Sequence, residues 1–238
     1  MPVPVDDREL RDIDPFDVLD AEYRRLDRFF SSLGADDWRR PTRCVGWTVR
    51  DMLAHMVGAE RYNQACLDDT LASLFEEVER AGVAGFDGYN EWSIATQADR
   101  PTDAVLATWQ TMAHDTRRRL RARGRDGTIT TSVGPYPAGL QAFHLASEAA
   151  THADDMDAPV SPEERTGRLA WRVAFSRVAV TEHDDAVTVE ARDGATLVRA
   201  ANAEDELPDE DFVAAVTGRL SEAHPLDPRL RERLQALN

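Results

Sequence analysis

The sequence contains no lysine: all 28 of its basic residues are arginine, set against 44 aspartates and glutamates. Without lysine, the chain cannot form a lysine Schiff base, and it cannot build the lysine-containing phosphate loop of many nucleotide-binding proteins. The formal net charge of −16 opposes binding to nucleic acids and to anionic membranes. Neither is therefore expected as a partner.

Cysteine and long apolar runs are also scarce. The two cysteines, Cys44 and Cys66, are too few for a disulfide scaffold and too far apart for a CxxC site. No stretch approaches the roughly 18 apolar residues of a membrane-spanning helix. The N-terminus, MPVPVDDREL, lacks the basic segment and apolar run of an export signal. These absences predict a cytoplasmic protein.

Apolar residues recur at spacings of three and four in several segments, which is typical of amphipathic helices. Thr48 with Asp51 three residues later gives a capping-box start for one of them. Residues 1–14 are expected to form a loose arm or first turn. The predicted main helices cover residues 15–34, a segment starting at Thr48, residues 101–124 and residues 139–156, with a further helix at residues 70–80.

The connections between these helices are predicted from their turn-forming residues. Three glycines in residues 82–92 indicate a loop or lid, and residues 126–139 read as a turn-rich connection. Five arginines crowd residues 117–123 at the end of a helix, where cations complement the helix dipole. The fold class expected for residues 1–158 is thus mainly α, a four-helix bundle with one long crossover.

The composition changes after Pro159, and residues 159–238 are predicted to form a small α+β appendage. Residues 169–180 fit either a helix or a strand. Residues 187–192 and 195–200 flank an Asp-Gly pair, which is a strong hairpin signal. Short helices are expected at residues 209–220 and 226–238.

The segment 139–156 carries the candidate site. As a helix it places His144, Glu148 and His152 at steps of four on one broad face, with Asp155 three residues further on. Imidazole and carboxylate groups on a rigid element are what a divalent transition metal needs. From this helix alone, a metal site and a water-exposed polar row are equal alternatives. His55, on the helix that begins at Thr48, is a ligand candidate only if another helix brings partners to it.

Two motifs in this chain occur together and in order. Residues 38–55 fit W-x-x-P-T-x-C-x-G-W-T-V-x-D-x-L-x-H, and residues 148–155 fit E-x-x-x-H-x-x-D. This combination resembles the mycothiol-dependent maleylpyruvate isomerase family, which belongs with the DinB-like metal-binding four-helix bundles. The resemblance covers roughly residues 15–157. The C-terminal part resembles the variable second domain of that family much more weakly.

The resemblance implies that His55, Glu148 and His152 bind one divalent ion, usually zinc, and that Asp155 supports that site from outside the ligand set. It also implies a cofactor, mycothiol, the low-molecular-weight thiol of actinobacteria. In the family, addition of the thiolate to a conjugated cis double bond, rotation and elimination give the trans isomer. Cys44 and Cys66 are then not needed as nucleophiles and are expected to be small buried hydrophobic residues.

The chemistry of these residue types agrees with that assignment. A site with two histidines and one glutamate leaves a coordination position open, as catalytic sites do. A thiol bound there is held as the nucleophilic thiolate.

His144 leaves several alternatives open. It could replace His55 as a ligand, act as a general acid or base, or cap the pocket. Three ligands at i, i+4 and i+8 of one helix drift by about 80° and rarely converge on one ion, so His55 is preferred. Arg50 and Arg61 could steer an anionic substrate, although salt bridges to acidic residues are the expected use.

Three functional classes follow from these features. The first is a thiol-dependent metalloenzyme, an isomerase or transferase that acts on a small electrophile. The second is a zinc hydrolase that uses metal-bound water. The third is a metal-binding bundle without catalytic activity. The chain is expected to be a monomer or a homodimer.

Overall fold

The computed structural model describes residues 7–237, which form two compact units. One unit contains residues 15–159, and the other contains residues 7–14 together with residues 160–237. Residues 1–158 were predicted to form the bundle, but residues 7–14 group with the C-terminal residues. The reason is that Leu10 is buried and Glu9 forms an ion pair of 2.7 Å with Arg177.

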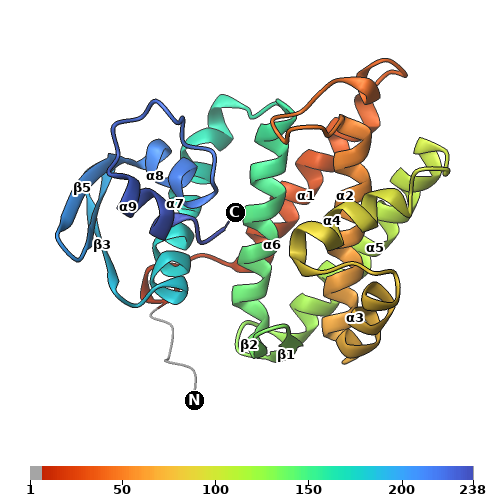
Figure 1. Ribbon diagram of the computed structural model, residues 1–238, viewed down its shortest axis with the longest axis horizontal. Coiled ribbons are helices and arrows are strands. Elements are labelled where there is room, and N and C mark those ends of the chain that lie inside the picture. The colour runs from red at the N-terminus through yellow and green to blue at the C-terminus, as the bar shows by residue number, and fades with distance from the viewer. Residues whose placement is uncertain (1–6, 238) are drawn as a thin grey trace. The chain divides into compact units, whose positions relative to one another are not determined.

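Four helices form the body of the first unit: α1 (Pro15–Ser32), α2 (Val49–Leu67), α5 (Thr102–Arg123) and α6 (Ala138–Asp155) (Figure 1). In this bundle α1 packs against α6 and α2 packs against α5. The predicted mainly α fold is confirmed. Across residues 7–237, none of the helices is both long and apolar enough to cross a membrane.

The apolar stripe predicted for α1 is buried in the bundle. Its members lie at helical spacing and are at most 7 % exposed: Phe16, Leu19, Tyr23, Leu26 and Phe30. Burying one such side chain stabilises the fold by about 1.5–3 kcal/mol, so this stripe fixes which face of α1 points inward.

Aromatic rings fill the centre of the bundle. Trp109 of α5 stacks on Tyr23 with 5.8 Å between ring centroids and meets Phe30 edge to face at 5.4 Å. Phe30 in turn stacks on Trp38, which lies in a short 3₁₀ helix, η2 (Asp37–Arg39), at 5.7 Å. The rings therefore connect α1, α5 and the segment that leads into α2.

A capping box fixes the start of α2. The Thr48 side chain accepts a hydrogen bond from the Asp51 backbone N–H, and the Asp51 carboxylate accepts one from the Thr48 N–H at 2.9 Å. Such a cap stabilises a helix by about 1 kcal/mol. Because it sets the first residue of α2, it also sets the direction in which His55 points, about two turns later.

The arginines at the end of α5 pair with acidic residues of other segments. Arg117 forms an ion pair of 2.7 Å with Asp20 of α1, and Arg121 lies 2.8 Å from Asp17 and 3.0 Å from Asp20. These arginines therefore form ion pairs that hold α5 against α1, in addition to the predicted interaction with the helix dipole.

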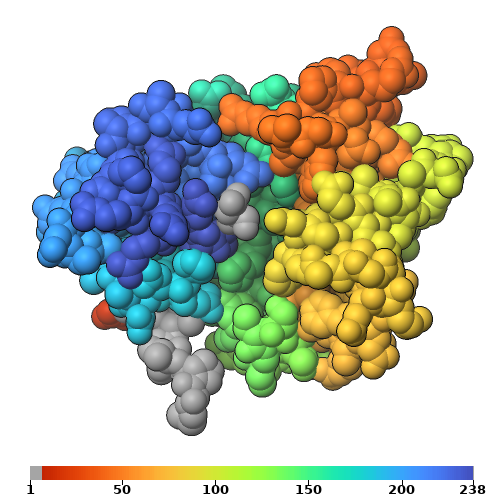
Figure 2. Space-filling model, viewed as in Figure 1, coloured from red at the N-terminus to blue at the C-terminus, as the bar shows by residue number. Residues whose placement is uncertain are grey.

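The predicted loop or lid at residues 82–92 is wrong. After α3 (Leu71–Arg80), the chain forms a further helix, α4 (Gly85–Ala95). In Figure 2 the surface of α3 and α4 (yellow) lies over α2, with which both helices are in contact. Tyr89 of α4 donates a hydrogen bond of 2.8 Å to the Gly58 carbonyl in α2. Burial of Tyr89 against α2 outweighs the low helix propensity of the glycines in α4.

The turn-rich connection before α6 contains a β-hairpin that the sequence did not predict. Strands β1 (Thr128–Thr131) and β2 (Gly134–Pro137) pair antiparallel, with Ile129 opposite Tyr136. Both of these side chains are buried. The hairpin is followed directly by α6, so it fixes the N-terminal end of the helix that carries the candidate ligands.

The C-terminal unit begins with a long helix, α7 (Pro162–His183), which resolves the ambiguity of residues 169–180 in favour of helix. Its start is fixed by a second capping box, between Ser161 and Glu164. The buried face of α7 contributes Val173 and Val180 to the core of this unit.

Three antiparallel strands follow in the order β3 (Val187–Arg192), β4 (Ala195–Ala200) and β5 (Ala203–Pro208). The hairpin predicted around Asp193–Gly194 is confirmed, with Gly194 at a φ of +69°, whereas β5 was not predicted. The unit ends with two helices that agree with the predicted ones, α8 (Asp209–Val216) and α9 (Pro228–Leu234).

Candidate metal centre

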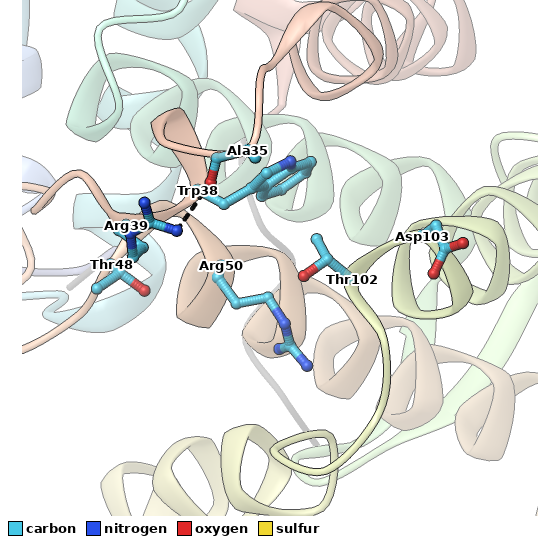
Figure 3. Close-up of a pocket in the computed structure, with 7 residues that line it drawn as sticks. All are labelled: Ala35, Trp38, Arg39, Thr48, Arg50, Thr102 and Asp103. Atoms are coloured by element: carbon cyan, nitrogen blue, oxygen red, sulfur yellow. Dashed lines mark hydrogen bonds between the residues drawn. The ribbon is translucent and has the colours of Figure 1, made fainter.

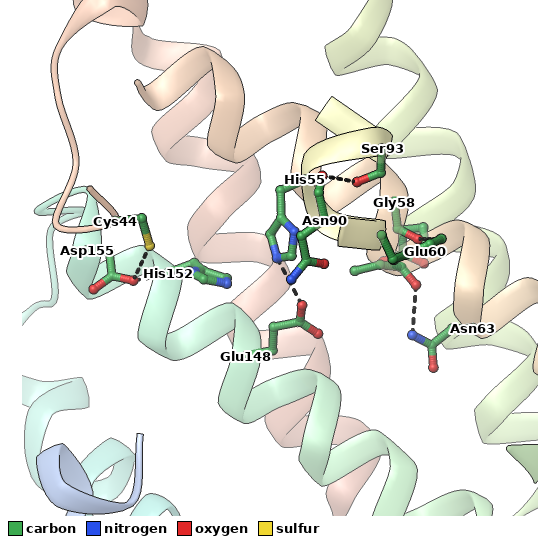
Figure 4. Close-up of polar contacts among 12 residues, drawn as sticks. Cys44, His55, Gly58, Glu60, Asn63, Asn90, Ser93, Glu148, His152 and Asp155 are labelled. Atoms are coloured by element: carbon green, nitrogen blue, oxygen red, sulfur yellow. Dashed lines mark hydrogen bonds and ion pairs between the residues drawn. The ribbon is translucent and has the colours of Figure 1, made fainter. Parts of the chain in front are cut away.

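The tertiary structure brings together the three side chains predicted to bind a metal. His55 comes from α2, and Glu148 and His152 come from α6 (Figure 4). One potential ligand atom from each residue lies within 4.8 Å of the other two. His55 Nε2 is 3.1 Å from Glu148 Oε1, and the two imidazole rings meet edge to face at 4.9 Å. The ligand set itself stays a prediction.

The three side chains of this cluster differ in how much of their surface is exposed to solvent. The side chain of His55 is 6 % exposed and that of His152 is 11 % exposed, whereas Glu148 is 33 % exposed. The histidines are thus held by the surrounding bundle, while the carboxylate is reached by solvent. Solvent therefore reaches the cluster on the side of Glu148.

The protonation states match what a metal requires. Burial by itself would raise the pKa of Glu148, but the hydrogen bond to His55 and the nearby histidines lower that pKa below its ordinary value. Burial lowers the pKa of His152, although the hydrogen bond to Asp155 opposes this effect. At neutral pH the carboxylate is ionised and the His152 imidazole is neutral. Metal ligands must be in these forms.

The donor types and the separation between His55 and Glu148 fit a divalent ion, and zinc is one such ion. Four ligands at about 2.0–2.1 Å in a tetrahedron lie about 3.3 Å from one another. The separation of 3.1 Å between His55 and Glu148 is close to that value. Two histidines and one carboxylate are the donor set of many catalytic zinc sites, which keep a position open for a water, a thiol or a substrate.

The two histidines are oriented in different ways. The Nδ1 atom of His55 is buried without a hydrogen-bond partner among the described residues, and its ring packs on Trp47 with 5.1 Å between centroids. His152 instead has its Nδ1 atom 3.1 Å from the Asp155 carboxylate. An ionised carboxylate at this place would hold a proton on Nδ1 and leave Nε2 for a metal, as is common around bound histidines.

Cys44 is not the small buried hydrophobic residue that was expected from the sequence. It is partly exposed, and its thiol donates a hydrogen bond of 3.4 Å to Asp155. Together with His152 these two residues form a second group of potential ligand atoms within 4.8 Å. The interpretation of Cys44 as a buried hydrophobic residue is wrong because a carboxylate faces it. The same interpretation holds for Cys66, which is 1 % exposed.

His144 lies outside both groups of potential ligands formed by the described residues. Its Nε2 atom is 3.0 Å from the hydroxyl of Tyr136 in β2. Its positive charge, when present, lowers the pKa of Glu148, so it is close enough to influence the cluster. Among the alternatives left open above, this geometry favours proton handling or capping of the pocket over metal ligation.

The two arginines near His55 are both engaged. Arg61 forms an ion pair of 2.5 Å with Glu77 and stacks over the ring of Trp92 at 5.1 Å. Arg50 donates hydrogen bonds to the carbonyls of Gln97 and Arg100, at 2.6 and 3.0 Å. The predicted salt bridge is therefore found for Arg61, whereas Arg50 binds backbone oxygens at the end of the α4 segment.

A pocket of about 480 Å³ lies elsewhere on the bundle, near the start of α2 and of α5 (Figure 3). The residues that line it are Ala35, Trp38, Arg39, Thr48, Arg50, Thr102 and Asp103. None of them is a candidate ligand, so this pocket carries no part of the metal centre.

One buried acidic residue near the centre, Glu60, was not predicted from the sequence. Glu60 of α2 is fully buried, and the Tyr23 hydroxyl donates a hydrogen bond of 2.6 Å to it. Burial raises the pKa of Glu60 to about 7, and the charge of Glu148 contributes to this rise. Glu60 lies in α2 among apolar neighbours, and only its position in an otherwise apolar stripe could have signalled it.

Comparison with known proteins identifies the family. A family model described as the mycothiol maleylpyruvate isomerase N-terminal domain matches residues 19–157, which is more than half of the chain. The chain belongs to this family. No curated protein and no solved structure matches the chain.

Membership in the mycothiol maleylpyruvate isomerase family applies to the first unit of the structure, because the match ends at residue 157 and the unit at residue 159. All of the candidate ligands lie inside the matched residues. The family name points to a mycothiol-related function, and the His/Glu cluster provides residues able to hold a metal.

Proposed function

We propose that the protein is a divalent-metal enzyme that uses mycothiol as its cofactor, either an isomerase of the maleylpyruvate type or a thiol transferase acting on a small electrophile. The metal is zinc, and the setting is one that keeps the thiol reduced, such as the cytoplasm. The observation that carries the proposal is the convergence of His55, Glu148 and His152 within 4.8 Å, inside the residues matched by the family model.

The proposed ligands are His55, Glu148 and His152. They would hold a zinc ion, which would supply a Lewis acid able to keep a bound thiol as thiolate at neutral pH. The exposed edge of Glu148 leaves room on that side for the thiol and the electrophile.

Neighbouring side chains are proposed to orient a ligand and to transfer a proton. Asp155 holds the proton on Nδ1 of His152 and so keeps Nε2 free. His144 is hydrogen-bonded to Tyr136 and lies one helical turn before Glu148. We propose that it gives or accepts a proton during the reaction of the substrate. Neither cysteine is required as a nucleophile in this scheme.

The first test is native mass spectrometry of the purified protein for bound metal and bound thiol. Variants His55→Ala and His152→Ala are expected to lose the metal. His114→Ala is the matched control, because His114 is an exposed histidine on α5. Full metal content in both ligand variants would contradict the proposed ligand set.

The second test is turnover of a desalted sample with and without added thiol. A maleylpyruvate-type substrate or an electrophile is expected to be converted only when the thiol is present. Thiol-independent hydrolysis would favour a zinc-bound water as the nucleophile. Intact metal without any turnover would favour a non-catalytic metal-binding bundle.

A further inference from the structure

The loop that leads into α2 is folded by its own backbone hydrogen bonds. The Thr42 N–H donates to the Trp47 carbonyl and the Trp47 N–H donates to the Cys44 carbonyl, both at 3.0 Å. Gly46 has a φ of +87°, which the third position of a type II turn requires. Val45 is fully exposed at the tip. The turn thus holds Cys44 and Trp47 in a fixed relation to each other.

This loop, residues 42–48, contacts His55 directly and is joined to His152 through Asp155. Trp47 packs on the ring of His55 at 5.1 Å. On the other side, the Cys44 thiol donates to Asp155 Oδ2 at 3.4 Å, and His152 Nδ1 lies 3.1 Å from the same oxygen (Figure 4). One carboxylate oxygen therefore joins the thiol to the imidazole.

Backbone hydrogen bonds hold Cys44 next to Asp155. The Arg43 N–H donates a hydrogen bond of 3.0 Å to the carbonyl of Asp155, the last residue of α6. The Thr42 hydroxyl accepts one of 3.1 Å from the Cys44 N–H. The side chain of Asp155 has no exposed surface, so its carboxylate depends on protein donors to hold its orientation.

We propose that Cys44 is a positioning residue of the metal centre, whose protonated thiol fixes the Asp155 carboxylate and, through it, the tautomer and ring direction of His152. This inference rests on the proposed function, because it assumes that His152 binds the metal. It assigns the thiol of Cys44 a structural hydrogen bond instead of nucleophilic or redox chemistry.

The test measures zinc affinity of the full chain by competition with a chromophoric chelator. Cys44→Ala is expected to weaken zinc binding about twofold to tenfold, which corresponds to the loss of one hydrogen bond. Cys44→Ser keeps a donor at this position and is expected to recover part of the loss. Cys66→Ala, a buried cysteine in α2 far along the helix from His55, is the matched control and is expected to bind zinc like the unaltered chain.

A double-mutant cycle separates positioning from general loop packing. If Cys44 acts through Asp155, then Cys44→Ala has no further effect on zinc affinity once Asp155→Ala is present. An equal loss in both backgrounds would overturn the proposal. Should Cys44→Ala fail to fold, as judged by its thermal transition, Cys44→Val, which also removes the donor, replaces it in the same cycle, with the same two outcomes.

Cobalt substitution separates positioning from direct ligation. The Co²⁺ protein is expected to show no thiolate charge-transfer band that depends on Cys44. Such a band, lost in Cys44→Ala, would make Cys44 a ligand and overturn the proposal. The failure of this inference is distinct from that of the proposed function: unaltered protein that binds no zinc contradicts both, whereas normal zinc binding that is insensitive to Cys44 contradicts only the positioning role.

Discussion

The buried carboxyl group of Glu60 makes the stability of the bundle depend on pH. Glu60 is 0 % exposed, and one of its oxygens, Oε2, has no hydrogen-bond partner among the described residues. Burial raises its pKa from the ordinary value of 4.5 to about 7, and the nearby hydroxyls of Thr116 and Tyr23 only partly oppose this. The substitution Glu60→Gln keeps the shape of the side chain and removes its ionisation.

The sign and size of the effect follow from the two pKa values. In the unfolded chain Glu60 ionises near 4.5, so between that pH and about 7 the folded protein holds a proton that the unfolded chain has lost. Stability from this group is fully present below about 4.5 and is lost as the pH rises through about 7. A pKa difference of about 2.5, at 1.36 kcal/mol for each pH unit, corresponds to about 3 kcal/mol.

The assay is urea unfolding of the metal-free protein, followed by tryptophan fluorescence at about pH 5 and about pH 8. Most of the tryptophans belong to the bundle and report its unfolding: Trp38, Trp47, Trp92 and Trp109. Relative to the unaltered chain, Glu60→Gln is expected to gain up to about 3 kcal/mol of unfolding free energy between the two pH values. His152 titrates in both proteins. The charge of Glu148 contributes to the raised pKa of Glu60, so the difference reports Glu60 together with its coupling to Glu148.

The control is Glu79→Gln, which alters an exposed glutamate of α3. It is expected to leave the pH dependence unchanged. If Glu60→Gln and the unaltered chain show parallel pH profiles, the buried carboxyl does not titrate near neutral pH. The reasoning from its burial would then be refuted.

Three further outcomes are expected. His55→Ala loses the metal, measured by elemental analysis, while His144→Ala retains it; the reverse result would replace the ligand set. Asp155→Asn keeps the fold and weakens metal affinity about tenfold to a hundredfold in a competition titration, and equal affinities would remove Asp155 from the site. Gly58→Ala lowers the unfolding free energy by about 1–3 kcal/mol in urea titrations, because its new Cβ would overlap the side chain of Ser93 in α4. Gly167→Ala, with open space around it, is the control and is expected to be neutral or stabilising.

Local sequence patterns were enough to predict most of the helices. The stripe of α1 repeats at the helical period, and the capping box at Thr48 marks the start of α2 within one residue of the observed helix. The hairpin around Asp193–Gly194 was predictable for the same reason, since two turn residues between alternating segments specify the pairing of their neighbours. These features depend on contacts between residues close together in the chain.

Elements that depend on distant partners were predicted poorly. The glycines of residues 82–92 indicated a loop, yet α4 forms because Tyr89 is buried against Gly58 of α2. The strand pair β1 and β2 was predicted only as a turn-rich connection, because the residue types of the two four-residue segments, TITT and GPYP, do not alternate clearly between apolar and polar. In both cases burial against another segment supplies the free energy that local propensity lacks.

The candidate site also contains both kinds of feature, those set by local sequence and those set by contacts between distant segments. The sequence by itself determined that Glu148, His152 and Asp155 share one side of a helix, because residues three and four apart are neighbours there. Only the tertiary structure decided that His55 meets them from α2, and that Cys44, 111 positions from Asp155, places its thiol on that carboxylate. Helical periodicity fixes neighbours within one helix, whereas contacts between helices depend on how their buried faces pack, which no local pattern in the sequence encodes.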